Sequence, residues 1–185
     1  MWVDQTVYSG PPAEERDPNE MAVYAFLDGL GIPYTRCDHE YANTMEDCKA
    51  VEAVLGAPIC KNLLLTNRKQ TDFYLLMMPG DKPFKTKDVT AQLGCARLSF
   101  ATPEHMKELL GAAPGSASAF ELMHDKEGKV QLVMDRELLE GESISGHPCF
   151  STSTLRLKRT DFLDRFLPAV GHQPVFVDLP WPEQE

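Results

Sequence analysis

The sequence predicts a mixed α/β (α+β) fold, with a mixed, mostly antiparallel central β-sheet and helices around it. Strand-like and helix-like segments are interspersed without the strict alternation of a doubly wound sheet. The most apolar stretches, residues 62–66 and 73–78, flank a polar turn and have the pattern of a β-hairpin that is buried on both faces. A chain of 185 residues with 43% hydrophobic residues can bury a core in one domain.

Helix and strand signals surround this hairpin. Apolar residues at helical spacing predict a helix over residues 19–30. Thr44 followed by Asp47 is a variant of the capping box, and Gly56 is a typical C-terminal stop, so residues 45–55 are predicted as a second helix. Shorter helices are expected at residues 87–93, 102–110 and 135–139, and from a cap at Thr160 to residue 167. Further strands are expected at residues 32–38, 130–134, 144–147, 152–157 and 175–177.

Composition divides the chain into three parts. Residues 1–18 hold prolines and acids and predict an extended leader, residues 19–178 a single domain, and residues 179–185 a C-terminal tail. No signal peptide and no membrane-spanning run is expected, which favours a cytoplasmic location. The five cysteines are odd in number and lack CxxC spacing. They are therefore expected to be reduced thiols, with no zinc site, other metal or cofactor.

The charge is distributed unevenly. A net charge of −10 argues against a protein that coats nucleic acid through bulk positive charge. The stretch from Lys61 to Arg97 nevertheless holds seven bases and three acids, a local net charge of +4. Such a cationic face suits a small anionic partner, although on charge alone a solvated hairpin and loop is the better explanation.

Three places could carry chemistry, and each has a plain structural alternative. Lys61 begins a strand of leucines, where its ammonium could face a pocket or reach solvent at the sheet edge. The small residues at 114–119 allow close backbone approach to a ligand, as in an oxyanion hole, or form an ordinary turn. His147 is held extended by Pro148 and could bind substrate, relay a proton or be a half-buried structural residue.

Other motifs are weaker or missing. The sequence holds no Gly-rich phosphate loop, no GxGxxG fingerprint, no GxSxG elbow and no Ser/His/Asp or Cys/His pattern of a general ester hydrolase. The neighbouring pairs Asp38-His39 and His124-Asp125 are expected at the surface or in turns.

Taken in order, these motifs resemble the prolyl-tRNA editing superfamily, known from YbaK-type proteins and the editing domain inserted in bacterial prolyl-tRNA synthetases. The matching stretches span residues 38–157, and the flanking helices fit too. They are Asp38-His39-Glu40, Lys61-Asn62-Leu63-Leu64-Leu65, Arg97-Leu98-Ser99-Phe100, residues 114–122, Val133-Met134-Asp135, and His147-Pro148 followed by residues 151–154. The likeness is strongest to free-standing members that deacylate alanine mischarged onto proline tRNA. Many members carry a GxxxP loop, whereas here Gly115 is followed by Ala119 at the fifth position.

The resemblance implies a YbaK-like editing domain that hydrolyses the ester of a mischarged aminoacyl-tRNA, with Ala-tRNA(Pro) as the expected substrate. It implies catalytic roles for Lys61 as an anion anchor, for the Gly115 backbone at the oxyanion, and for His147 in orienting the ribose or amino acid. The implied substrate-binding residues are Asn62, Ser116, Ala117, Ser118 and Ala119. The implied tRNA contacts are Arg97, Lys82, Lys85 and Lys87.

The resemblance also implies partners. They are the tRNA acceptor end and prolyl-tRNA synthetase, with no membrane and no metal. No protein general base is evident, and the resemblance implies that the substrate's own ribose hydroxyl helps to activate water.

Two alternatives remain open at this point. The sequence does not fix the pocket volume, so a deacylase for cysteine or serine is one alternative. A non-catalytic module that binds an aminoacylated ligand or docks onto a synthetase is the other, because Ala119 changes the loop.

Overall fold

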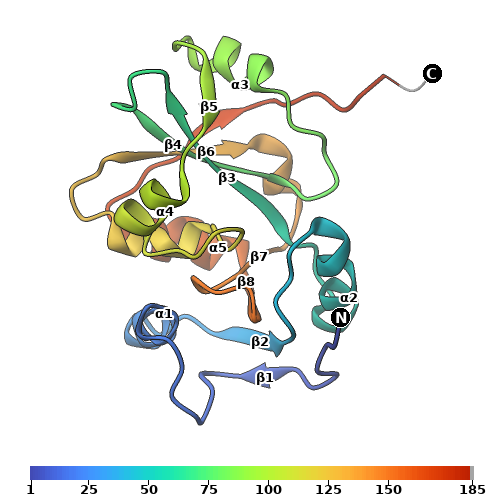
Figure 1. Ribbon diagram of the computed structural model, residues 1–185. Helices are drawn as coiled ribbons and strands as arrows, with labels where there is room; N and C mark the ends of the chain where they lie inside the picture. Colours follow the sequence, from blue (N-terminus) through green and yellow to red (C-terminus); the bar gives the residue numbers. More distant parts are fainter. Residues whose placement is uncertain (184–185) are drawn as a thin grey trace.

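The computed structural model describes residues 1–183 and divides the strands between two sheets (Figure 1). The larger sheet has the order β5 (Leu98–Phe100), β3 (Cys60–Asn67), β4 (Phe73–Pro79), β6 (Val130–Asp135) and β9 (Val175–Val177). The smaller sheet has the order β1 (Tyr8–Ser9), β2 (Tyr34–Asp38), β8 (Ser153–Lys158) and β7 (Ser143–Gly146). Among the strands of residues 1–183, only the β4–β6 and β6–β9 pairs are parallel. The mixed, mostly antiparallel class is confirmed, but the strands build two sheets where one central sheet was predicted.

Helices pack against both sheets (Figure 1). The longer ones are α1 (Pro18–Gly29), α2 (Met45–Leu55), α3 (Thr86–Leu93) and α4 (Pro103–Leu110). Shorter helical segments are η1 (Ala119–His124), η2 (Arg136–Glu140) and the continuous stretch of α5 (Arg159–Asp161), η3 (Phe162–Phe166) and α6 (Leu167–Ala169). None of these helices is long and apolar enough to cross a membrane.

Local signals fix the helix ends. Thr44 and Asp47 form the predicted capping box of α2, and Gly56 ends the helix in the left-handed conformation with φ of 67°. The final helical stretch begins after Lys158, so the predicted cap at Thr160 is wrong. Its start is set by the end of the preceding strand, since Lys158 is the last residue of β8.

The predicted hairpin of β3 and β4 is buried on both faces, as its leucines indicated. Leu64 and Leu75 belong to the main core, which α1 and the segment from η1 to α6 complete. Leu65 and Leu76 point the other way into a second core with Val89 of α3. The alternation of side chains along a strand thus lets one hairpin separate two cores.

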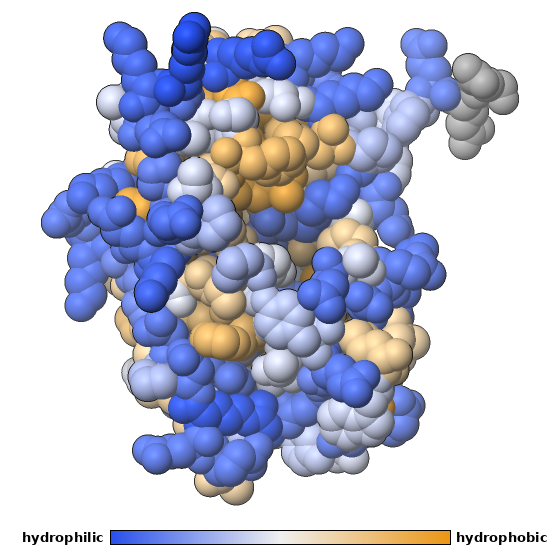
Figure 2. Space-filling view, in the orientation of Figure 1, coloured by the Kyte–Doolittle hydropathy of each residue, from blue (hydrophilic) through white to orange (hydrophobic). Residues whose placement is uncertain are grey.

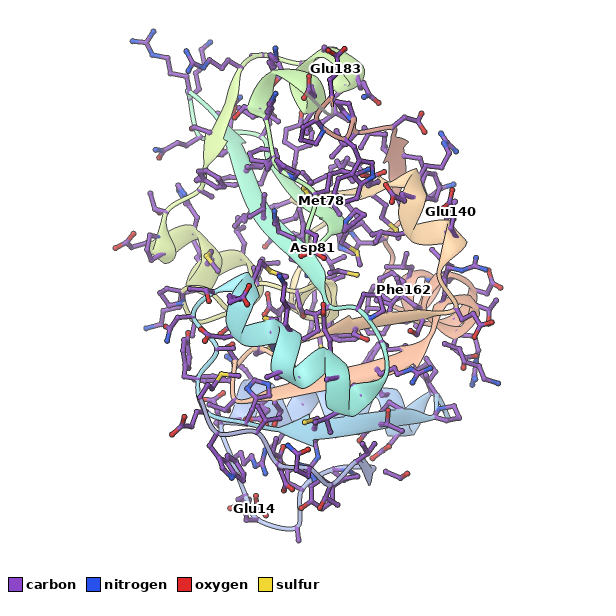
Figure 3. The ribbon with its side chains drawn as sticks, turned by 90° about the vertical axis from the view of Figure 1, so that its right-hand side faces the viewer. Glu14, Met78, Asp81, Glu140, Phe162 and Glu183 are labelled. Carbon is purple, nitrogen blue, oxygen red and sulfur yellow. The ribbon has the colours of Figure 1, made fainter. Side chains whose placement is uncertain are left out.

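The 17 residues before α1 are packed against the smaller sheet. The backbone N–H of Asp4 donates to Asp38 O at 2.9 Å, and β1 pairs with β2. Arg16 donates to the Asp38 carboxylate at 2.9 Å and to Ser153 Oγ at 2.8 Å. These bonds join the leader to β2 and β8. Glu14 and Glu183 mark opposite ends of the molecule in Figure 3.

The position of the site follows from a difference in strand length. β4 pairs with β3 from Cys60 to Thr66, whereas β5 pairs only with Leu65 to Asn67. The outer edge of β3 is therefore unpaired by any described strand between Cys60 and Leu63. In Figure 3, α2 crosses in front of the region where the two sheets meet.

Candidate functional site

A cavity of about 340 Å³ lies beside the unpaired edge of β3. Its walls come from β3, the start of α2, the end of β5, the loop around residue 115 and the end of β7. The structure brings together five of the residues singled out in the sequence; these are Lys61, Asn62, Gly115, Ala117 and His147. Most other lining residues are apolar, among them Met45, Ile59, Leu64 and Met106. Residues 1–183 hold no group of three or more histidine, cysteine or acidic side chains placed to bind a metal ion.

Lys61 is half-buried in this cavity, and its ammonium is held by a backbone group. Its Nζ donates to the carbonyl oxygen of Lys82 at 2.7 Å. Burial lowers the pKa of Lys61, and the charge of Asp81 opposes this shift. Within residues 1–183, Lys61 forms no ion pair with a carboxylate. Its positive charge is consequently free to interact with a phosphate or carbonyl group.

Lys82 was predicted to contact tRNA, and the structure contradicts this. Its side chain is buried, and its Nζ donates to Asp135 Oδ2 at 2.7 Å and to Leu179 O at 2.8 Å. Glu137 completes the ion pair. These contacts anchor the turn after β4, and the Lys82 carbonyl oxygen on this turn accepts the hydrogen bond from Lys61 Nζ. Asp81, on the same turn, is labelled in Figure 3. Lys82 therefore supports the site from within the protein.

The remaining predicted tRNA contacts lie on the surface. Lys85, Lys87 and Arg97 are all exposed, and Lys85 and Lys87 lie at the start of α3. They stay available to an anionic partner.

We expect Lys82→Ala to lower the free energy of unfolding by about 3–5 kcal/mol, because it leaves the Asp135 carboxylate buried without its partner. Lys85→Ala is the matched control and should change stability by less than about 0.5 kcal/mol. Urea unfolding followed by circular dichroism measures both. Equal stabilities of the two variants would contradict the buried role of Lys82.

The loop before η1 is held by bonds from several segments. Gly115 has φ of 77°, a conformation that side-chain-bearing residues rarely adopt. The Tyr41 hydroxyl donates to Pro114 O. Ser118 Oγ donates to His147 O at 2.6 Å, which fixes the loop relative to the end of β7.

Three predicted substrate-binding residues are buried away from the cavity. Ser116, Ser118 and Ala119 have exposed fractions of 0%, 1% and 3%. Ser116 Oγ lies 3.2 Å from the Tyr41 hydroxyl, and Ser118 caps η1. Their side chains thus shape the loop. The cavity is lined instead by Gly115 and Ala117, whose backbone N–H groups donate no hydrogen bond within residues 1–183.

Ala119, at the position where the resembled family often has proline, is the first residue of η1. Proline suits this position because the N–H of a first helical residue has no partner within the helix. Here a capping box fixes the helix start, since Ser118 N donates to Glu121 Oε2 at 3.1 Å and Ser118 Oγ accepts from Phe120 N. Burial raises the pKa of Glu121 well above its usual value. In this protein the hydrogen bonds of the capping box fix the start of η1, as a proline ring would by restricting φ.

Ala119→Pro should be tolerated and should raise the free energy of unfolding by about 0.4–1 kcal/mol, because proline restricts the unfolded chain. The backbone of Ser118, with φ of −149° and ψ of 165°, already suits a residue before proline. Thermal unfolding measures the effect. A lower melting temperature would contradict this prediction, because it would mean that the proline ring clashes with its surroundings or that the N–H group of residue 119 is needed for a hydrogen bond.

His147 belongs to a buried hydrogen-bonded network. Its Nδ1 lies 3.0 Å from Ser153 O, which can only accept, so Nδ1 carries a proton. Its Nε2 lies 3.3 Å from Ser151 Oγ. Thr154 Oγ1 lies 3.2 Å from His147 Nδ1 and 2.9 Å from His39 Nε2. Burial lowers the pKa of His147 to about 4, so the ring at the cavity wall is neutral near pH 7.

His39 was predicted at the surface or in a turn, and the structure contradicts this. It is 4% exposed, and its Nδ1 donates to Glu40 O at 2.7 Å. Local sequence could not reveal its burial, because its partner Thr154 lies 115 residues further along the chain. One sequence signal did point to His39 and Thr154: both lie in stretches that match the prolyl-tRNA editing superfamily.

The fold should lose stability as pH falls from 6.5 toward 4. Over this range the unfolded chain protonates residue 147 and the folded protein does not, which costs up to about 1.4 kcal/mol per pH unit. His147→Gln should reduce this dependence. Urea unfolding between pH 4.5 and 7.5 compares the slopes, and identical slopes for both proteins would argue against a neutral, buried His147.

Comparison with known proteins identifies the family to which this chain belongs. The family model described as the aminoacyl-tRNA editing domain matches residues 39–165, more than half of the chain. The protein is therefore an aminoacyl-tRNA deacylase, which hydrolyses the ester of a mischarged tRNA. The chain belongs to the aminoacyl-tRNA editing domain family.

Relatives and solved structures agree with this assignment. The chain is 29% identical over 160 residues to the prolyl-tRNA editing protein ProX of Acetoanaerobium sticklandii, covering 86% of this chain and 97% of ProX. It is 31% identical over 157 residues to prolyl-tRNA synthetase associated domain-containing protein 1 of Xenopus laevis, covering 83% and 92%. A crystal structure described as a candidate trans-editing enzyme for prolyl-tRNA synthetase superposes with a TM-score of 0.63 at 20% identity, covering 90% of this chain and 100% of that one. The last comparison supports the fold.

Proposed function

We propose that the protein is a free-standing editing enzyme that releases alanine from mischarged proline tRNA. The observation that carries this proposal is the convergence of Lys61, the Gly115–Ala117 backbone and His147 on one cavity. The names of its relatives, a prolyl-tRNA editing protein and a protein associated with prolyl-tRNA synthetase, support proline tRNA as the carrier.

The lining suits ester hydrolysis without a protein nucleophile. Water adds to the ester carbonyl carbon, and the free N–H groups of Gly115 and Ala117 donate to the oxygen that becomes negative. The bond to the ribose oxygen then breaks, that oxygen takes a proton, and free alanine and uncharged tRNA leave. Lys61 holds the phosphate or carbonyl region of the terminal adenosine, and a ribose hydroxyl of the substrate positions the water.

Asn62 supplies a place for the amino group. Its Nδ2 donates to Cys60 O at 3.1 Å, whereas its Oδ1 is buried and has no hydrogen-bond partner within residues 1–183. A buried acceptor without a partner is costly, so a ligand donor is expected there. The α-ammonium of an aminoacyl ester fits this requirement.

The cavity can act as a second sieve for a synthetase. A proline pocket rejects a smaller side chain by only about 10–200-fold per methylene. A separate hydrolytic site that admits a methyl group and excludes the proline ring removes the error. The apolar lining from Met45, Ile59 and Met106 favours alanine over serine.

The surface cations define how tRNA approaches. Lys85, Lys87 and Arg97 are exposed and contact the acceptor end in this proposal. Contact limited to that end involves few phosphates, which agrees with a net charge of −10. We place the reaction in the cytoplasm, with prolyl-tRNA synthetase as the source of the mischarged tRNA.

Lys61→Ala should slow alanine release from Ala-tRNA(Pro) by about 10²–10³-fold and leave the fold intact, because it removes a charged donor from a half-buried position. Single-turnover assays with tRNA(Pro) carrying alanine, serine, cysteine or proline measure the rate and the preference. Lys129→Ala, which removes an exposed lysine elsewhere, is the control.

Near-normal turnover by Lys61→Ala would overturn the role of Lys61. Faster release of cysteine or serine than of alanine would support the alternative deacylase. Binding of Ala-tRNA(Pro) by the wild-type protein without release of alanine would support a non-catalytic module.

A further inference from the structure

Phe100 is an exposed aromatic residue at the rim of the cavity. Its exposed fraction of 63% exceeds that of every other exposed large hydrophobic residue within 1–183. It lies in β5 opposite Leu65, which is fully buried, and it also lines the cavity. An apolar ring of this size placed in water beside a binding cavity is a candidate contact surface.

Phe100 has an aromatic neighbour that is itself anchored. The ring centroids of Phe84 and Phe100 are 5.7 Å apart, with an angle of 59° between the rings. Phe84 packs against the second core, between the end of β4 and α3. Figure 2 shows an apolar patch on this face, below α3 and beside β5 as these elements lie in Figure 1. The anchored Phe84 limits the positions that Phe100 can take.

Three exposed cations lie close to this aromatic pair in the chain. Lys85 and Lys87 follow Phe84 in the chain, Arg97 precedes β5, and all three are exposed. An exposed aromatic ring flanked by exposed cations is the arrangement with which proteins bind single-stranded nucleic acid, because bases stack on the ring and phosphates meet the charges.

The distance along β3 places Phe100 close to the part of the cavity where the ester would react. Leu65, opposite Phe100, is four residues from Lys61, or about 13 Å along the strand. An aminoacyl group in the cavity is attached to the terminal ribose of the tRNA. The terminal nucleoside must therefore lie at the opening of the cavity, close to its rim.

We propose that Phe100 is a stacking platform for the terminal adenine base of the tRNA 3′ end; this inference rests on the proposed function. Stacking is independent of Lys61 and the loop amides, and it holds the nucleoside while they hold the aminoacyl group. Loss of one base–aromatic stack weakens binding about 5- to 150-fold.

The experiment uses an RNA hairpin ending in CCA, with 2-aminopurine in place of the terminal adenine. Stacking on a protein ring quenches its fluorescence. We expect quenching by the wild-type protein and by Phe100→Tyr, which keeps the ring. Phe100→Leu should lose the quenching, bind about 5- to 150-fold more weakly, and raise KM for Ala-tRNA(Pro) far more than it changes kcat. Trp2→Leu, which removes an exposed aromatic ring elsewhere, should behave as wild type.

The outcomes separate the two proposals. Equal quenching and equal KM for the wild type and Phe100→Leu would overturn the stacking platform, whatever the deacylation rate. Quenching that depends on Phe100 in a protein that releases no amino acid would support the platform and overturn the proposed deacylation. Thermal unfolding of Phe100→Leu checks that this exposed substitution leaves the fold intact.

Discussion

The site depends on one feature of strand pairing: β5 ends where the functional half of β3 begins. An unpaired strand edge exposes backbone groups that other chains can pair with, so proteins usually cover it. Here the edge from Cys60 to Leu63 faces a cavity. The other walls of this cavity include the loop at residues 115–117 and the start of α2. If β5 were four residues longer, it would fill the space that the cavity occupies.

The polar groups around this edge are held by bonds that reach far across the sequence. Lys61 is oriented by the turn that the Lys82–Asp135 ion pair anchors. The loop and His147 are joined by Ser118. Behind His147, the carbonyl oxygen of Ser153 accepts a hydrogen bond from the Nδ1–H group. The Ser153 hydroxyl donates to Asp38, to which Arg16 of the leader also donates. These polar groups are thus held by bonds within the protein, and donors that are positioned in advance stabilise developing charge.

The sequence predicted the features whose signals are local. The capping box of α2 and the hairpin of β3 and β4 are encoded by neighbouring residues, and both are present. β1 and β5 escaped prediction because two or three residues show no period, and neither strand is a continuous apolar run like the three-residue β9. Lys82 and His39 were misjudged because their partners, Asp135 and Thr154, lie 53 and 115 residues away. The convergence of Lys61, Gly115 and His147 was anticipated only through the ordered set of family motifs, since spacing alone does not place three distant segments together.

In the proposed function, the charged end of tRNA binds at the unpaired edge of β3. A crystal structure of the protein with a stable amide analogue of 3′-alanyl-adenosine tests this most directly. We expect the alanyl group inside the cavity, its carbonyl oxygen within hydrogen-bonding distance of the Gly115 and Ala117 N–H groups, and its ammonium at Asn62 Oδ1. An analogue bound on another face of the protein, with this cavity filled only by water, would contradict it.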